Sequence, residues 1–214
     1  MLYSVSELKE DIRIALDQNM TSEQLFETGD IDTLSLEEII ESKIVDAARL
    51  VEGTAPSYLL NGGKAFGDSI SWDSAHGYGS GRILLPDDFL RLVSFQMSDW
   101  DYPVTLPITE DDPAYAMQQS RYPGIKGNPQ RPVVAITMQP AGQVLEFYSC
   151  MAGESVYVRR AQYIPIRTIE DGMIDLCEKL RRPIVYRAAQ LVATSIGDTD
   201  AATALLNISN ELMK

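Results

Sequence analysis

The stretch Arg82-Ile-Leu-Leu-Pro-Asp-Asp-Phe-Leu-Arg-Leu-Val-Ser-Phe-Gln-Met-Ser-Asp-Trp100 predicts the central strand of the chain. Pro86 interrupts an apolar approach, and Asp87 and Asp88 lead into a run in which apolar and polar residues partly alternate. Both faces of this run are apolar at its start, and one face becomes polar toward Trp100. The pattern is typical of a strand that begins buried between two layers and ends at a rim.

Helical patterns lie on both sides of this strand in the sequence. The segment Ser4-Val-Ser-Glu7 has the form of a capping box, and apolar residues follow at spacings typical of one helix face. A second capping box at Ser35-Leu-Glu-Glu38 predicts a helix that runs to about Val51. Near the other end, residues 172–213 predict a helical hairpin, punctuated at Gly197.

The segment 61–81 is rich in glycine and differs in composition from its surroundings. It lacks the Gly-Lys-Ser/Thr ending of a P-loop and the spacing of a dinucleotide fingerprint. We therefore expect a long loop or β-arm. Trp72 and Tyr78 lie in this segment, and large aromatic side chains on a loop are candidates for contact with a partner surface.

Residues 82–165 have the composition of a β-rich insertion. After the first strand, short apolar runs separated by Pro and Gly turns predict three more strands, at residues 132–138, 143–150 and 155–164. The fold class that we expect is α+β. It is a single domain, 1–214, with a mainly helical body and one inserted antiparallel sheet of about four strands.

Composition supports a folded domain. The 214 residues are 45% hydrophobic and 23% charged, as in globular proteins. No apolar run approaches the roughly 20 residues of a membrane span, and no signal peptide is evident. Cys150 and Cys177 have neither zinc-ligand nor disulfide-framework spacing, so we expect two small buried side chains in a reducing compartment.

The formal net charge of −13 is unevenly distributed. Residues 1–60 hold thirteen acids against four bases, whereas residues 131–214 hold nine of each. The bases of this last third are Arg131, Arg159, Arg160, Arg167, Lys179, Arg181, Arg182, Arg187 and Lys214. An acidic surface disfavours ordinary nucleic-acid binding, because such binding requires the neutralisation of phosphates.

Residues with catalytic or metal-binding chemistry are sparse. His76, the only histidine, lies in the glycine-rich segment, where an exposed loop residue is the ordinary case. The neighbouring acids Asp87/Asp88 and Asp111/Asp112 lack the alternation of a calcium loop. No base accompanies Cys150 in the sequence. We expect no catalytic residue, no metal and no cofactor.

The adjacent pair Arg181-Arg182 precedes Pro183, which suits the first turn of a helix. Positive charge at a helix N-terminus is disfavoured by the helix dipole. The pair is therefore a solvated helix end, a salt-bridge partner for the acidic helices, or a docking site for an acidic partner. Together with Arg187 it forms our candidate docking cluster, and Trp100, at the polar end of the central strand, is a further candidate contact.

The order of these parts resembles the head-to-tail adaptor proteins of short-tailed phages, of the tail-tubular-protein-A type. Connector ring proteins of crAss-like gut phages have a similar layout. The resemblance covers roughly residues 5–60 and 82–213, and segment 61–81 does not map onto it. It is carried by the two N-terminal helices and by these motifs: Leu85-Pro-Asp-Asp-Phe-Leu-Arg-Leu-Val93, Tyr115-Ala-Met-Gln-Gln-Ser120, Arg131-Pro-Val-Val-Ala-Ile136, Leu145-Glu-Phe-Tyr148 and Pro183-Ile-Val-Tyr-Arg-Ala-Ala-Gln-Leu-Val192.

This resemblance implies a non-enzymatic virion protein of the neck or tail, assembled in the host cytoplasm. Such adaptors form a homo-oligomeric ring, commonly of about twelve copies, that binds the portal and the tail or nozzle proteins. Genomic DNA passes through the ring without sequence-specific binding, and no membrane is involved. An acidic lumen would suit this passage, since duplex DNA carries about one negative charge per 1.7 Å.

Two other readings are open. The pI near 4.4 also suits an acidic binding module, such as an inhibitor that mimics DNA. An enzyme that uses the glycine-rich segment, with an Asp or His76 as base, is the third reading.

Overall fold

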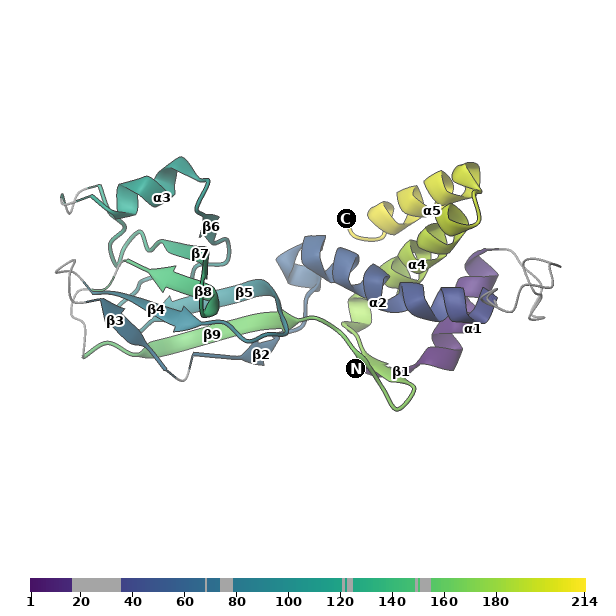
Figure 1. Cartoon of the computed structure of the whole chain (residues 1–214), viewed down its shortest axis with the longest axis horizontal. Coiled ribbons are helices and arrows are strands. Elements are labelled where there is room, and N and C mark those ends of the chain that lie inside the picture. Colours follow the sequence, from purple (N-terminus) through teal and green to yellow (C-terminus); the bar gives the residue numbers. More distant parts are fainter. Residues whose placement is uncertain are drawn as a thin grey trace. The chain divides into compact units, whose positions relative to one another are not determined.

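The computed structural model describes residues 1–16, 36–67, 69–73, 79–120, 122, 125–148, 150 and 155–214. The chain divides into two units (Figure 1). Unit 1 combines residues 1–61 with residues 166–214, and unit 2 comprises residues 62–165. The central strand and the glycine-rich segment from Gly62 onward belong to unit 2, whereas the candidate docking arginines belong to unit 1.

Unit 1 is built mainly from helices. They are α1 (Val5–Ala15), α2 (Leu36–Thr54), α4 (Arg181–Ser195) and α5 (Thr199–Glu211), with short 3-10 turns at Ser57–Leu59 and Glu178–Leu180. A small antiparallel sheet has the order β1-β11-β10, formed by β1 (Leu2–Ser4), β11 (Met173–Asp175) and β10 (Ile169–Glu170).

The amphipathic pattern of the sequence decides which helix faces are buried in unit 1. Apolar residues at helical spacing in α1 and α2, such as Leu8, Ile12, Ile40 and Ile44, are fully buried. They pack in one apolar core with α4 and α5, where alanines such as Ala188 allow close approach of the helices. The second predicted capping box begins at Ser35, which lies outside the described residues.

Unit 2 contains two sheets and one short helix, α3 (Pro113–Gln118). The first sheet has the order β2-β9-β5, formed by β2 (Lys64–Ala65), β9 (Val158–Pro165) and β5 (Phe89–Met97). The second has the order β3-β4-β8-β7-β6, formed by β3 (Ser71–Asp73), β4 (Ser80–Leu84), β8 (Gly142–Phe147), β7 (Val134–Gln139) and β6 (Ile108–Thr109). All pairs are antiparallel except β6 with β7, which is parallel.

Aromatic side chains join the two sheets of unit 2 into one core. Phe95 of β5 and Phe147 of β8 are fully buried, and their ring centroids lie 5.8 Å apart. Phe66 packs on Phe95 at 6.2 Å, and Trp100 meets the same ring edge-on at 5.6 Å. Offset and edge-to-face pairs at such distances add to the stabilisation from apolar burial.

The α+β class is confirmed, but the expectation of one inserted sheet is wrong, since the described residues already form three sheets. The turn at Pro86–Asp88 sends β4 and β5 into different sheets of unit 2. The described parts of segment 61–81 supply strands to both of these sheets. Residues 173–175 form a strand of the third sheet in unit 1, ahead of the C-terminal helices. Alternation marks strands but does not identify their partners.

The expected rim at the end of the central strand is also absent. Met97 is fully buried. The polar residues Ser94 and Gln96 are each more than nine-tenths buried. Gln96 Nε2 donates a hydrogen bond to the Trp100 carbonyl at 3.0 Å, and Ser94 Oγ donates to Gln162 Oε1 at 3.3 Å. Polar residues are tolerated inside unit 2 because these bonds satisfy them.

Candidate functional site

The N-terminus of α4 holds the predicted pair Arg181 and Arg182. Arg181 Nη2 donates to Asp11 Oδ2 of α1 at 2.7 Å, and its guanidinium lies 5.1 Å from the centroid of the Tyr3 ring. The salt-bridge reading therefore applies to Arg181. Because the side chains of Arg181 and Asp11 are each more than one-third exposed, we expect this ion pair to contribute little to stability.

Arg182 has a different environment. Its side chain is exposed, and it forms no ion pair with any residue in the described ranges. A cation in the first turn of a helix opposes the helix dipole, and here no described carboxylate compensates that cost. Arg182 is thus the member of the pair that is available to an external partner.

A surface groove of about 520 Å³ runs beside these arginines, between α1, α4 and α5. Two of its apolar side chains are largely exposed, Ile14 at 64% and Ile208 at 43%. Apolar side chains grouped at a groove with a charged edge are typical of protein-contact surfaces. We call this the α1–α4–α5 groove; its principal residues are Asp11, Ile14, Arg181, Arg182, Leu205 and Ile208.

Arg187, the third predicted docking residue, does not join this groove. It lies five residues after Arg182, which places it on another face of α4. There it lines a separate hollow of about 390 Å³ with residues of α2 and α5, including Leu50 and Asn210. The predicted cluster of three arginines is therefore two separate surface features.

Arg167, another base of the C-terminal third, is not a surface residue. Its Nε donates to Glu52 Oε2 at 2.7 Å and its Nη2 to Glu52 Oε1 at 3.1 Å, while Nη1 donates to Asp175 Oδ2 at 3.0 Å. Glu52 is 0% exposed and also accepts from the Cys177 amide at 3.2 Å. Burial alone would lower the pKa of Arg167, but the hydrogen bonds and charge of Glu52 raise it.

This Arg167–Glu52 pair is a structural element that our sequence reasoning missed. The only hint in the sequence is an acid, Glu52, directly after the buried Val51 near the end of a helix. Its partner is 115 residues away, so no local pattern points to it.

Of the aromatic candidates, Trp100 belongs to the core of unit 2 and not to a contact surface. Only 2% of it is exposed, because it packs against Phe95. Trp72 is half-buried, and its ring meets that of Phe147 edge-on at 5.5 Å. Tyr78 and His76 lie outside the described residues. Trp72 therefore keeps a partly exposed face, whereas Trp100 does not.

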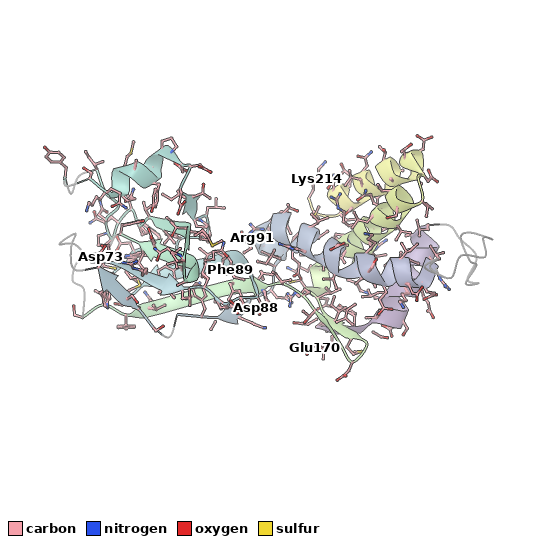
Figure 2. The ribbon with its side chains drawn as sticks, in the orientation of Figure 1. Asp73, Asp88, Phe89, Arg91, Glu170 and Lys214 are labelled. Carbon is pink, nitrogen blue, oxygen red and sulfur yellow. The ribbon has the colours of Figure 1, made fainter. Side chains whose placement is uncertain are left out.

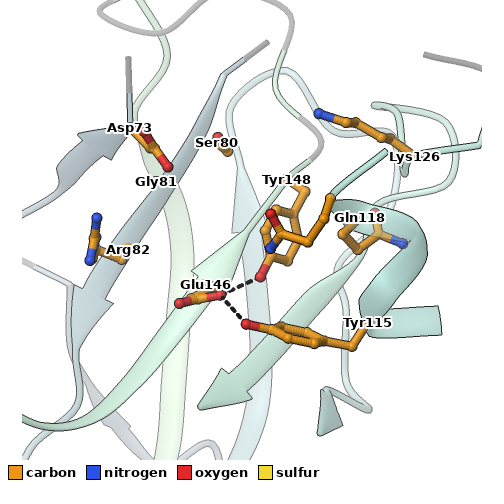
Figure 3. Close-up of a pocket in the computed structure, with 10 residues that line it drawn as sticks. Asp73, Ser80, Gly81, Arg82, Tyr115, Gln118, Lys126, Glu146 and Tyr148 are labelled. Atoms are coloured by element: carbon orange, nitrogen blue, oxygen red, sulfur yellow. Dashed lines mark hydrogen bonds between the residues drawn. The ribbon is translucent and has the colours of Figure 1, made fainter. Parts of the chain in front are cut away.

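A small polar pocket of about 110 Å³ lies in unit 2 between β4, β8 and α3 (Figure 3). Glu146 is its hub: Tyr115 donates to Oε2 at 3.2 Å, Tyr148 donates to the same oxygen, and Gln139 donates to Oε1 at 2.9 Å. Ser80, 7% exposed, lines the pocket, and its hydroxyl has no hydrogen-bond partner among the described residues.

The tyrosines of this pocket act as neutral donors. Burial, and then the hydrogen bond to Glu146, raise the pKa of Tyr148 far above its usual range. Burial and the charge of Glu146 also raise the pKa of Tyr115. Since Tyr115 belongs to α3 and Glu146 to β8, these bonds tie the short helix to the larger sheet.

One acid of each adjacent pair in the sequence has a structural partner. Asp88, directly before β5 (Figure 2), accepts from Tyr163 at 2.6 Å and from Lys64 at 3.1 Å. Burial opposes its ionisation, but these bonds outweigh burial and lower the pKa of Asp88. Asp112 caps α3 by accepting from the Ala114 amide at 2.8 Å.

The two cysteines are buried thiols. Burial raises the pKa of Cys150 to about 12, and burial likewise raises the pKa of Cys177. Within the described ranges, no group of three or more His, Cys, Asp or Glu side chains is placed to hold a metal ion. None of the described helices is long and apolar enough to cross a membrane.

No protein-family model matches this chain. No curated protein matches it either.

Proposed function

We propose that this chain is a structural protein of a short-tailed phage, one copy of a ring between the portal and the tail. The observation that carries the proposal is the α1–α4–α5 groove, where apolar side chains and the unpaired Arg182 are exposed together at a helix N-terminus. A groove of this composition is suited to contact with another protein. The resemblance to head-to-tail adaptors supplies the kind of assembly.

The charge of the chain supports the same function. A net charge of −13 per copy would accumulate in a ring and repel duplex DNA from its walls, so that DNA passes without being trapped. In this proposal the portal lies on one side of the ring and the tail or nozzle proteins on the other. We expect about twelve copies, as in the adaptors that the chain resembles.

The proposal predicts binding to phage heads that contain DNA and a portal but lack a tail. The purified chain should co-sediment with such heads, and reversing both charges by Arg181→Glu with Arg182→Glu should abolish this binding, since the charged edge of the groove is inverted. The matched control reverses another adjacent and exposed pair, Arg159→Glu with Arg160→Glu in unit 2.

Unchanged binding of the Arg181/Arg182 variant would contradict any role of this groove in assembly on the head, whether its direct partner is the portal or a neighbouring copy. If the wild-type chain does not bind heads at all, the connector function itself is wrong. The acidic binding module, suggested by the pI near 4.4, then becomes the better candidate.

A further inference from the structure

We propose that the occupant of the α1–α4–α5 groove is the next copy of the same chain, which presents an acidic face of unit 1. This inference rests on the proposed ring. It selects a neighbouring subunit, instead of the portal, as the direct partner of Arg182. The contact joins two different surfaces of identical chains.

The acidic face lies around a second hollow, of about 560 Å³, formed by α1, the start of α2 and the turn between β10 and β11. We define this acidic face by Lys9, Glu10, Arg13, Glu37, Glu41 and Asp171. Four acids against two bases give it a net charge of −2. Lys9 pairs with Glu41, and Arg13 pairs with Glu37.

Two carboxylates of the acidic face are left for a partner. Glu10 and Asp171 are exposed, and neither forms an ion pair within the described part of the chain. Asp171 follows Glu170, which is also exposed and is labelled in Figure 2. The uncompensated charge of this face therefore belongs to groups in contact with solvent.

The two surfaces are complementary in charge. The groove has Arg181 and Arg182 against Asp11, a net charge of +1, and its unpaired group is the cation Arg182. The acidic face has a net charge of −2, and its unpaired groups are carboxylates. Contact between them would neutralise charges that unit 1 leaves uncompensated, and it would cover the exposed Ile14 and Ile208.

The placement of the two surfaces on α1 determines the symmetry of this contact. Asp11 and Ile14 line the groove, whereas Glu10 and Arg13 line the acidic face. Since successive helical residues are rotated by about 100°, Lys9 and Arg13 lie on the other side of α1 from Asp11 and Ile14. Glu10, one turn before Ile14, lies at the border between the two surfaces. A contact between unlike surfaces is heterologous, and its repetition closes a ring when the rotation permits.

A mixing experiment tests the pairing. The first variant, Arg182→Glu, changes the groove from +1 to −1. The second, Glu10→Lys with Asp171→Lys, changes the acidic face from −2 to +2. Each variant alone then brings like charges together, and we expect its self-assembly to weaken at least about tenfold. A mixture restores opposite charges at every contact and should assemble as a ring of alternating variants.

These assemblies are measured by mass photometry at equal total concentration, with and without tail-less heads. The charge-matched control is Arg159→Glu in unit 2. Assembly of Arg182→Glu at the wild-type level, or no recovery in the mixture, would overturn the contact while leaving the connector function intact. A monomeric Arg182→Glu chain with a lower Tm and no recovery would mean that the groove is filled within one chain. A wild-type chain that neither assembles nor binds heads would overturn the connector function as well.

Discussion

Replacing Glu52 with alanine is expected to lower the free energy of unfolding of unit 1 by about 3–5 kcal/mol. The substitution leaves the buried Arg167 guanidinium without its two hydrogen-bond acceptors from Glu52. Among the described residues, only the exposed Asp175, at 3.0 Å from Nη1, then remains as an ionic partner, and a buried cation so poorly paired costs more than a lost surface pair. Far-UV circular dichroism during urea unfolding is a suitable measurement, because the long helices among the described residues all belong to unit 1.

Two control variants separate this effect from a general loss of charge or contact. Asp46→Ala removes an exposed acid of the same helix, paired with Lys43 at 3.9 Å, and should cost about 1 kcal/mol or less. The double variant Glu52→Leu with Arg167→Met removes both charges and should recover much of the stability lost by Glu52→Ala. A loss below about 1 kcal/mol for Glu52→Ala would mean that Arg167 reaches solvent when its partner is absent.

Replacing Phe147 with alanine is expected to destabilise unit 2 by about 3–5 kcal/mol. The Phe147 ring is fully buried and contacts the rings of Phe95 and Trp72, at centroid distances of 5.8 and 5.5 Å. The cavity left behind would remove the ring contact that joins the two sheets in their shared core. Tryptophan fluorescence reports this transition selectively, because both tryptophans of the chain lie in unit 2.

The neighbouring glycine provides a coupled control. A Cβ atom at Gly81 would lie 2.6 Å from the Phe147 ring, so Gly81→Ala should destabilise the wild-type chain. In a Phe147→Leu background the clash is relieved, and the cost of Gly81→Ala should fall. If the effects of Gly81→Ala and Phe147→Leu on stability were additive, the packing described for this core would be contradicted. As a control, Tyr102→Ala removes an exposed side chain and should change stability little.

Hydrophobic periodicity predicted the elements of the fold better than their arrangement. Val5, Leu8 and Ile12 marked the buried face of α1, and the run from Phe89 to Met97 became β5. The sheets were predicted wrongly because strand pairing is a long-range property. β5 pairs with β9, about seventy residues later, while β4 pairs with β8.

The candidate surfaces, like the sheets, depend on contacts between residues that are distant in sequence. The dipole argument pointed to the start of α4, but it could not distinguish Arg181, which pairs with Asp11, from Arg182, which forms no ion pair with the described residues. The predicted docking cluster also included Arg187, which lies on another face of the helix. Arg167, another base of this third of the sequence, is buried. Partners distant in sequence decide which charges remain available.

The measurement that tests the connector function most directly is the mass distribution of the purified wild-type chain, alone and on tail-less phage heads. Mass photometry should give a discrete species near an integral multiple of 23.8 kDa, about twelvefold, either in solution or after release from heads. Negative-stain microscopy of that species should show a closed ring with a central opening. A chain that remains at 23.8 kDa under both conditions would contradict the proposal.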